Sequence, residues 1–379
     1  MNMMHPIRVL HILHSMNRGG AENALMNYYR NINRDKVQFD FLLTDSQKGQ
    51  FEDEIKQLGG KIYKIPLITM SNPFPYLKSV KEFLNTHPQY RIVHSHTSSK
   101  SVFPLWMAKQ CGVPVRCSHS HSSMAEKGVS GWIRKCLMPF LKVTATDFLS
   151  CGNQAAVYLY GQKCFDEGKV KVFKNVIETQ KFHYSKEKRK EYRSKLGIED
   201  DVVLLGHTAR FDPVKNHPFD IEILSELLKM GVKTKLLLVG DNTASGIERV
   251  NQKIDEFGVG DDVIFTGVVS NVYDYEQAMD AFLLPSFNEG LPLSIIEAQV
   301  SGLPCFTTKD RVSSECSVTD LVHYLSLEAG AKLWADEILK ACNQARSDRW
   351  DEVAAAGYDA KTSARELQEF YISRYTETK

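Results

Sequence analysis

Short apolar runs alternate with helix-length amphipathic segments along most of this chain, and that alternation constrains the fold more than any other feature. A first series of apolar runs covers residues 8–13, 39–44, 61–66, 92–96, 115–120 and 145–151. A second series covers residues 202–209, 233–240, 263–267, 281–285 and 305–308. Continuous apolar strands separated by helices are typical of parallel sheets covered on both faces. The sequence therefore predicts an α/β protein with two doubly wound, Rossmann-like domains.

The two series are separated by a segment rich in charge. The chain has 379 residues, too many for one ordinary hydrophobic core. Residues 181–201 lack a strand and are expected to include a solvated helix. We place the domain boundary just before that segment, which gives domains at 1–178 and 179–359. Parallel sheets bind ligands at the carboxyl ends of their strands, so two such domains are expected to face each other across a central cleft.

Composition excludes several classes of function. Lys and Arg number 47 against 46 Asp and Glu, and this balance offers nucleic acid no electrostatic attraction. The eight cysteines form no CxxC pair and are expected to be buried, reduced thiols of a cytosolic protein. A strand-like run begins within a few residues of Met1, which leaves no room for a signal peptide. No apolar run approaches the roughly 20 residues of a membrane span. We expect a cytoplasmic protein, with contact to a membrane surface left open.

Two carboxylates near one strand end suggest a binding site. Glu289 stands in the turn SFNEGLP after the apolar run 281–285, and Glu297 follows in a predicted helix that starts near Leu293. The amides of Gly290, Leu291 and Leu293 and the helix dipole are expected to form an anion site. Helical side chains lean toward the N-terminus, so both acids can reach one ligand and accept hydrogen bonds from its hydroxyls. A sugar nucleotide has this form, with an anionic diphosphate between two hydroxyl-bearing rings.

Positive charge is expected at the first strand end of the second domain. The segment GHTARFDPVKNH places Arg210 at the strand end and Lys215 in the loop. Arginine binds phosphate through paired donors and lysine acts as a compact charge. The alternative is that both are ordinary solvated surface cations.

A glycine pair follows the first strand of the chain. Gly19 and Gly20, in SMNRGGAENAL, allow close approach of the backbone to a phosphate at a helix start. The pattern is not GxGxxG, so it gives little support for a dinucleotide site. The alternative is a simple turn.

Two histidine pairs end neighbouring strands of the first domain. Alternation along a strand places His94 and His96 on one side, and likewise His119 and His121. Four histidines raise the hypothesis of a zinc site. No carboxylate or cysteine joins them at ligand spacing, so we expect no metal ion. The remaining alternatives are satisfied polar residues at the sheet edge and a histidine that contacts a bound sugar.

In this order and spacing, the motifs resemble those of family 4 glycosyltransferases. GGAE, RFDPVKNH, EGLPLSIIE after LLPS, and the closing SGLP carry the resemblance, which extends from Arg8 to the terminal helix. That family comprises retaining enzymes of GT-B architecture. The segments RIVHSH and VRCSHSHSS are most similar to bacterial members that build capsular polysaccharide or exopolysaccharide.

The resemblance implies a role for each matching residue in the second domain. Glu289 would contact hydroxyls of the donor sugar, and Glu297 would hold the ribose. Arg210 and Lys215 would bind the diphosphate and stabilise the charge that develops on departure. The nucleobase would meet backbone groups around 265–268. The remaining donor-binding residues of this domain would be Gly267, Asn288, Gly290 and Leu291.

The first domain would take the acceptor side. Gly19 and Gly20 would lie beside the phosphates, and His119, with His121 as the second choice, would contact the donor sugar. The terminal helix, within about 360–379, would pack back on this domain. No metal or cofactor is implied. One departure from the family pattern is FKNVIE, residues 173–178, where Lys174 replaces a proline, and we interpret it as a variant hinge.

The resulting hypothesis is transfer of a hexosyl group from a nucleoside-diphosphate sugar, by preference a UDP-sugar, to a hydroxyl of a glycan or lipid-linked saccharide. Residues 130–142 combine Trp132 and Phe140 with basic side chains, and they fit either a membrane-surface helix or an ordinary packing helix.

Two other functions stay open. A GT-B epimerase would need further acids for proton transfer, and a non-catalytic sugar-nucleotide sensor would bind without turnover.

Overall fold

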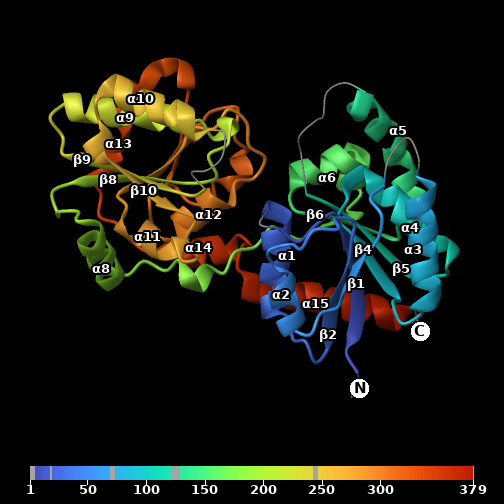
Figure 1. Ribbon diagram of the computed structural model, residues 1–379. Coiled ribbons are helices and arrows are strands. Elements are labelled where there is room, and N and C mark those ends of the chain that lie inside the picture. Colours follow the sequence, from blue (N-terminus) through green and yellow to red (C-terminus); the bar gives the residue numbers. More distant parts are fainter. Residues whose placement is uncertain (1–4, 18, 69–72, 122–128, 242–245, 379) are drawn as a thin grey trace. The chain divides into compact units, whose positions relative to one another are not determined.

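The computed structural model describes residues 5–17, 19–68, 73–121, 129–241 and 246–378, and the chain divides into two compact units. Unit 1 comprises Met1–Val176 with Ala360–Lys379, and unit 2 comprises Ile177–Asp359 (Figure 1). The boundary therefore falls inside the segment 173–178. The expected boundary was two residues later, after Glu178.

Unit 1 is built on a seven-stranded parallel sheet in the order β3-β2-β1-β4-β5-β6-β7. Its strands are β1 (Ile7–Leu13), β2 (Val37–Leu43), β3 (Ile62–Lys64), β4 (Ile92–Ser95), β5 (Val115–Ser120), β6 (Asp147–Ser150) and β7 (Val170–Val172). Its helices are α1 (Gly20–Asn31), α2 (Glu52–Gln57), α3 (Phe74–Thr86), α4 (Val102–Gln110), α5 (Val129–Thr144), α6 (Asn153–Tyr160), α7 (Gln162–Asp166) and α15 (Ala360–Glu377). The strand order reverses between β1 and β4, the switch point at which such sheets bind ligands.

Unit 2 repeats this plan with a six-stranded parallel sheet in the order β10-β9-β8-β11-β12-β13. Its strands are β8 (Val203–Thr208), β9 (Thr234–Val239), β10 (Val263–Gly267), β11 (Ala281–Leu284), β12 (Cys305–Thr308) and β13 (Val322–Leu325). Its helices are α8 (Lys186–Leu196), α9 (His217–Lys229), α10 (Ile247–Phe257), α11 (Val272–Ala278), α12 (Leu293–Val300), α13 (Gly330–Cys342) and α14 (Trp350–Ala355). The switch point lies between β8 and β11, and the expected fold of two doubly wound domains is confirmed.

The C-terminal helix completes the core of unit 1. Leu367 and Tyr371 of α15 are buried in the same hydrophobic cluster as Phe39 and Phe41 of β2. In Figure 1 this helix, coloured red, runs beside the sheet of unit 1. Because the rings of Phe39 and Tyr371 meet edge to face at 6.0 Å, the end of the chain is an integral part of unit 1.

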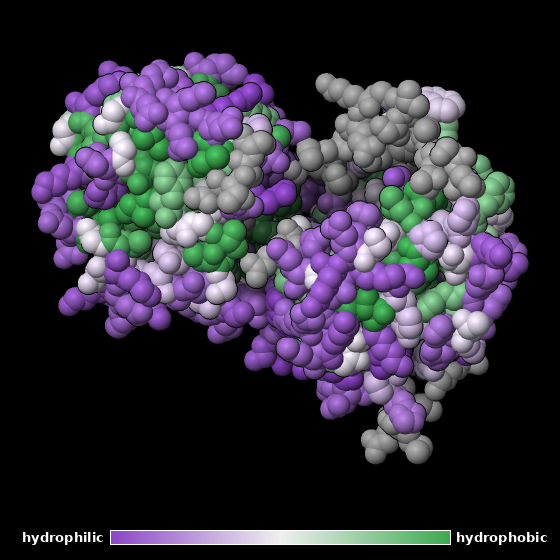
Figure 2. All heavy atoms as spheres, in the orientation of Figure 1, coloured by the Kyte–Doolittle hydropathy of each residue, from purple (hydrophilic) through white to green (hydrophobic). Residues whose placement is uncertain are grey.

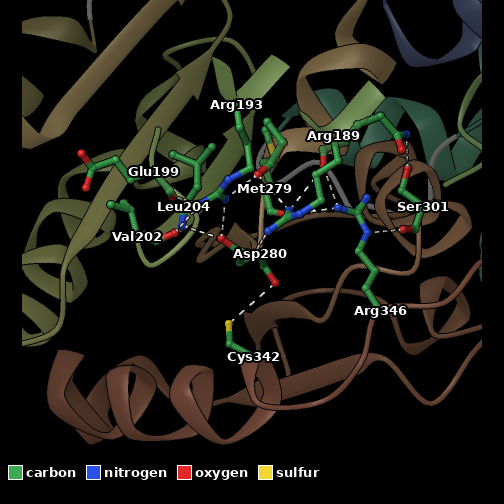
Figure 3. Close-up of polar contacts among 12 residues, drawn as sticks. Arg189, Arg193, Glu199, Val202, Leu204, Met279, Asp280, Ser301, Cys342 and Arg346 are labelled. Carbon is green, nitrogen blue, oxygen red and sulfur yellow. Dashed lines mark hydrogen bonds and ion pairs between the residues drawn. The ribbon is translucent and has the colours of Figure 1, made fainter. Parts of the chain in front are cut away.

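Three arginines hold the turn that leads into β11 (Figure 3). Arg346 is half-buried, and its guanidinium donates to the carbonyls of Ser301 at 2.6 Å, Gln277 at 2.9 Å and Met279 at 3.0 Å. Burial lowers the pKa of Arg346 to about 9. Arg189 and Arg193 pair with Asp280 from the other side of the turn. The start of β11, and with it the loop that follows, is therefore fixed by charge-assisted hydrogen bonds.

Residues 181–201 contain the expected helix, α8, most of which is exposed, although its Tyr192 and Arg193 are buried. The expectation that the cysteines are all buried is wrong. The cysteines are free thiols as expected, yet Cys136 on α5 is exposed rather than buried. The structure also adds two strands that were not expected, β7 and β13, at the edges of the two sheets.

Hydrophilic residues cover most of the face shown in Figure 2, with smaller hydrophobic areas on each unit. Several large apolar side chains are nevertheless exposed on unit 1, among them Trp132 (69%) and Phe140 (59%) of α5. Leu141 of the same helix is fully buried. The side chains of Ile133 and Arg134 lie outside the described residues. No helix in the described part of the chain is long and apolar enough to cross a membrane.

Candidate active site

The loops after β8 and β11 meet at the switch point of unit 2. The loop after β8 ends in a short 3-10 turn, η3 (Pro213–Lys215), in which the amide of Val214 donates to the Asp212 carboxylate at 3.0 Å. Two hydrogen bonds join this turn to the loop after β11: Phe287 N donates to Val214 O at 2.8 Å, and Asn216 Nδ2 donates to Pro285 O at 3.1 Å. Residues far apart in the sequence are thereby held as one surface.

Lys215 and Glu289 form an ion pair on that surface. The distance from Lys215 Nζ to Glu289 Oε1 is 2.6 Å, and the two side chains are 22% and 16% exposed. Ser286 Oγ donates to the same carboxylate oxygen at 3.3 Å, and Glu289 N donates to Arg311 O at 2.9 Å. The sequence named both charged residues for a donor site, and the structure brings them into direct contact.

Other predicted residues of unit 2 lie in the same two loops, after β8 and after β11. Arg210 is exposed, directly after β8, and Asn288 is exposed beside Glu289. Gly290 and Leu291 are half-buried and immediately precede Pro292, the N-cap of α12. In the described part of the chain, the amides of Gly290 and Leu291 have no hydrogen-bond acceptor. Free amides at a helix start, next to two cations, can bind an anion.

Glu297 faces a second acid that sequence reasoning missed. Burial raises the pKa of Glu297 to about 7. Glu276 of α11 is fully buried, and burial together with the charge of Glu297 raises its pKa well above the usual value. Neither carboxylate oxygen of Glu276 has a hydrogen-bond partner among the described residues. The pair can therefore keep a proton near neutral pH. The only sequence signal for Glu276 was an acid on an otherwise apolar helical face.

Two buried histidines, His207 and His217, lie next to the loop that carries Lys215. His207 Nδ1 lies 2.6 Å from Asp220 Oδ2, and both side chains are fully buried. The ring of His217 stacks on His207 at 4.0 Å and on Phe211 at 4.4 Å between centroids. Burial lowers the pKa of His207 to about 3 and that of His217 to about 2, so both rings stay neutral. They fix the path of the loop without adding charge to it.

Gly267 ends β10 in the left-handed region, with φ of +68°. Its carbonyl accepts a hydrogen bond from Gly240 N at 3.1 Å, which ties it to the end of β9. The next residue, Val268, is 65% exposed. The backbone predicted to meet a nucleobase is thus at the same edge of the sheet as the Lys215–Glu289 pair.

In unit 1, the glycine pair stands at the start of α1. Gly19 is the N-cap of that helix, and a Cβ there would lie 2.3 Å from Glu22 Oε2. A Cβ at Gly20 would meet open space. Because a Cβ at Gly19 would displace only the flexible end of the Glu22 side chain, close packing requires glycine at neither position. Burial raises the pKa of Glu22, which lies under this turn.

The predicted histidines of unit 1 gather in one cluster, and a fifth histidine joins them. His94 and His96 stack on each other, as do His119 and His121, which confirms that each pair lies on one side of its strand. His119 is buried and His121 is half-buried. His11 of β1 completes the cluster. It lies opposite His94 on the neighbouring strand β4 and within hydrogen-bond distance of His96, and the sequence around His11 did not indicate these contacts.

Comparisons with known proteins agree on one family. The model for "Glycosyl transferase 4-like domain" matches residues 19–173, and that for "Glycosyl transferases group 1" matches residues 188–356. The putative glycosyltransferase EpsF of Bacillus subtilis is 33% identical over 370 residues, which is 96% of each chain. The chain belongs to the GT-B glycosyltransferases.

Other similarities extend over most or nearly all of the chain. The capsular polysaccharide biosynthesis glycosyltransferase CapH of Staphylococcus aureus is 27% identical, covering 97% of this chain and 99% of CapH. The UDP-Gal:alpha-D-GlcNAc-diphosphoundecaprenol alpha-1,3-galactosyltransferase of Escherichia coli is 24% identical over 72% of each chain. Among solved structures, Anabaena HepE in complex with UDP has a TM-score of 0.75 at 17% identity, covering 97% of this glycosyltransferase and 100% of HepE.

Proposed function

We propose that this glycosyltransferase moves a hexosyl group from a UDP-sugar to a hydroxyl of a glycan or lipid-linked saccharide, with retention of configuration, in capsule or exopolysaccharide synthesis. The Lys215–Glu289 pair at the switch point of unit 2 carries the proposal, because it sets a cation for a diphosphate beside a carboxylate for sugar hydroxyls. The names of CapH and of the Escherichia coli galactosyltransferase support the pathway and the donor.

Lys215 is placed to bind the diphosphate while it keeps its ion pair. An ammonium group has three donor hydrogens, and Glu289 takes one of them. Arg210 and the free amides of Gly290 and Leu291 add further donors at the same strand edge. We propose that these groups stabilise the charge that develops on the departing UDP. We propose that Lys215 and Arg210 neutralise the diphosphate.

The transfer step is proposed to occur on one face of the sugar. The bond from the anomeric carbon to the β-phosphate oxygen breaks, and a bond from the acceptor oxygen to that carbon forms. The acceptor proton passes to the departing phosphate. Glu289 orients the sugar through its hydroxyls, and Glu297 accepts hydrogen bonds from the ribose. Asn288 flanks the sugar contact, and the backbone at Gly267 meets the base.

The residues of unit 1 complete the assignment. Gly19 and Gly20 are proposed to lie beside the phosphates, where Gly20 leaves open space for them. His121 is more exposed than His119 and is the better of the two for a sugar contact. These roles remain predictions.

We propose that a lipid-linked acceptor is met at the cytoplasmic membrane surface through α5. Trp132 and Phe140 are exposed on this helix, and Lys135 and Lys142 add positive charge. The wild type should sediment with vesicles of anionic phospholipid, and the variant W132S/F140S should stay in the supernatant. Equal sedimentation of the two would assign α5 to ordinary packing at the protein surface.

The donor is tested by hydrolysis and transfer assays with UDP-, GDP- and ADP-sugars. The proposal expects steady turnover with a UDP-sugar, at least tenfold faster than with the same sugar on GDP or ADP. Turnover confined to a GDP- or ADP-sugar would show that the assigned nucleotide is wrong and that the protein is still a glycosyltransferase. Binding of every donor without turnover, with and without undecaprenyl-diphosphate saccharides, would overturn the proposal.

A further inference from the structure

Five histidines from three neighbouring strands of unit 1 pack ring against ring. They are His11 of β1, His94 and His96 at the end of β4, and His119 and His121 at the end of β5. The ring centroids lie 4.2 Å apart for His94 and His96 and 4.1 Å apart for His119 and His121. Hydrogen bonds join the two stacks, between His94 and His119 at 3.1 Å and between His96 and His121 at 2.8 Å. The glycosyl transfer proposed above uses one of these rings, for a sugar contact, and gives no role to the rest of the cluster.

One chain of hydrogen bonds fixes the protonation of three rings. His121 Nδ1 lies 3.3 Å from Asn175 Oδ1, an acceptor, so this nitrogen carries the proton and Nε2 has the lone pair. His121 Nε2 then accepts from His96 Nδ1, and His96 Nε2 accepts from His11 Nδ1 at 3.0 Å. Each ring is neutral. His121 and His96 each donate through Nδ1 and accept through Nε2, whereas His11 donates through Nδ1 and its Nε2 has no partner among the described residues.

His119 has a nitrogen that this network does not use. Its Nδ1 pairs with His94 Nε2, and His94 Nδ1 pairs with the hydroxyl of Tyr371 at 2.6 Å. Its Nε2 is buried with no hydrogen bond of normal geometry among the described residues, although the backbone of Phe173 also acts on this ring, and the side chain is only 4% exposed. A buried polar atom without a partner is costly, and in a native protein a water molecule or a ligand normally satisfies it.

The geometry points to a divalent transition-metal site, with Zn²⁺ as its ion, formed by His96, His119 and His121. One ring nitrogen from each of the three lies within 4.8 Å of the other two. Two nitrogen ligands of tetrahedral zinc stand about 3.3 Å apart, given zinc–nitrogen bonds of roughly 2.0 Å. The 2.8 Å between His96 Nδ1 and His121 Nε2 needs to open by only about half an ångström.

The outer contacts of these ligands are those of a metal site. A metal-bound histidine normally donates its second nitrogen to a fixed acceptor, which orients the ring. Here the second nitrogens pair with His11, His94 and Asn175, one for each ligand. Three histidines would leave a fourth position of a tetrahedral ion open for water or a hydroxyl.

Charge and proton balance also permit the ion to bind. Burial lowers the pKa of all three rings below the usual histidine value, so each is neutral at pH 7. To free its Nδ1, His96 moves its proton to Nε2, and His11 moves its own from Nδ1 to Nε2. No proton leaves the protein. Neither His119 nor His121 can bind the ion and contact the donor sugar through the same nitrogen at once, so the two roles can be separated by measurement without donor.

Metal titration of the full chain tests this site. Protein treated with a chelator and then freed of it is titrated with Zn²⁺ against a chromophoric competitor, and with Co²⁺ by visible absorption. We expect one equivalent per chain, with the intense bands of tetrahedral Co²⁺. His119→Asn and His121→Asn should each lose at least 100-fold in affinity, and Asn175→Ala should lose about 10- to 100-fold. His14→Asn, an exposed histidine outside the cluster, should bind as wild type does.

Several results would overturn the proposal. They are sub-stoichiometric binding by the wild type, wild-type affinity in His119→Asn, and a loss in His14→Asn equal to that in His119→Asn. Circular dichroism checks that each variant is folded. If the ligand variants do not fold, Asn175→Ala decides, because its unchanged zinc affinity would exclude His121 as a ligand.

Discussion

At the scale of single residues, the proposed chemistry depends on how Lys215 shares its ammonium hydrogens between Glu289 and the diphosphate. Its ammonium group contacts Glu289 at 2.6 Å and is only 22% exposed, so it is already oriented before a ligand arrives. An oriented donor in a partly buried site stabilises developing charge at little reorganisation cost. The same contact keeps Glu289 from rotating away from the sugar position.

Replacing Lys215 with alanine tests that role. We expect donor turnover to fall about 100- to 1000-fold, the loss typical of removing one preorganised charge-stabilising donor. Lys229→Ala, in the last turn of α9, removes a lysine whose partner is Glu226 and should leave turnover unchanged. Both variants should unfold in urea at the wild-type midpoint. Turnover of the Lys215 variant within twofold of wild type would refute the assignment.

The raised pKa of Glu297 predicts a pH-dependent stability. Burial lifts this pKa from 4.5 to about 7 in the folded protein, so between these values the folded state binds a proton that the unfolded state has lost. The free energy of unfolding should therefore fall as pH rises from 4.5 to 7, by up to about 3 kcal/mol, and then level off. Urea unfolding at pH 5.0 and 7.5 measures it. Glu297→Gln should flatten the slope, whereas exposed Glu248→Gln should not.

Sequence predicted the charged residues of unit 2 but not their contacts. Lys215 and Glu289 were each identified from their place at a strand end, which is a local property. Glu276 and His11 were missed because their importance comes from neighbours supplied by distant segments. A lone acid in a helix and a lone histidine in a strand carry no signal of such neighbours in a single sequence.

At the scale of elements, buried strands and the start of α12 were predictable, and the edge strands were not. Strand β11 is an unbroken apolar run, β8 begins with one, and proline next to a helix start is a strong local signal. Strands β7 and β13 have only three and four residues, and Val170 is their one buried residue. They are strands because a neighbouring strand offers hydrogen bonds, which is a property of the sheet.

The turn before β11 should be the most sensitive element of unit 2. Arg346→Ala removes the donors for the carbonyls of Gln277, Met279 and Ser301, and it should lower the free energy of unfolding by about 3 kcal/mol or more. Lys340→Ala removes an exposed ion pair on α13 and should cost less than about 1 kcal/mol. Denaturant unfolding compares the two. Equal stabilities would show that the turn does not depend on Arg346.

At the scale of the whole molecule, the chain forms two units, and its last helix belongs to the first of them. Continuity of the chain from Val176 to Ile177, and again from Asp359 to Ala360, means that unit 2 is inserted into unit 1. The folding of unit 1 therefore requires both ends of the sequence, as the placement of Tyr371 against Phe39 shows.

Truncation of Tyr371 should destabilise one unit more than the other. Tyr371→Ala removes a fully buried ring and should cost unit 1 about 3–5 kcal/mol. Amide hydrogen exchange should accelerate in β1 and β2 and stay unchanged in β8 and β9. Thr376→Ala, an exposed position of the same helix, serves as the control. Equal acceleration in both sheets would mean that the units unfold together.

The central claim is that unit 2 binds the nucleoside-diphosphate end of the donor at its switch point. A crystal structure of the protein with a UDP-sugar bound tests it most directly. We predict diphosphate oxygens within about 3 Å of Lys215 Nζ, sugar hydroxyls at Glu289 and the ribose at Glu297. A nucleotide bound away from the loops after β8 and β11, with the Lys215–Glu289 pair undisturbed, would contradict the account.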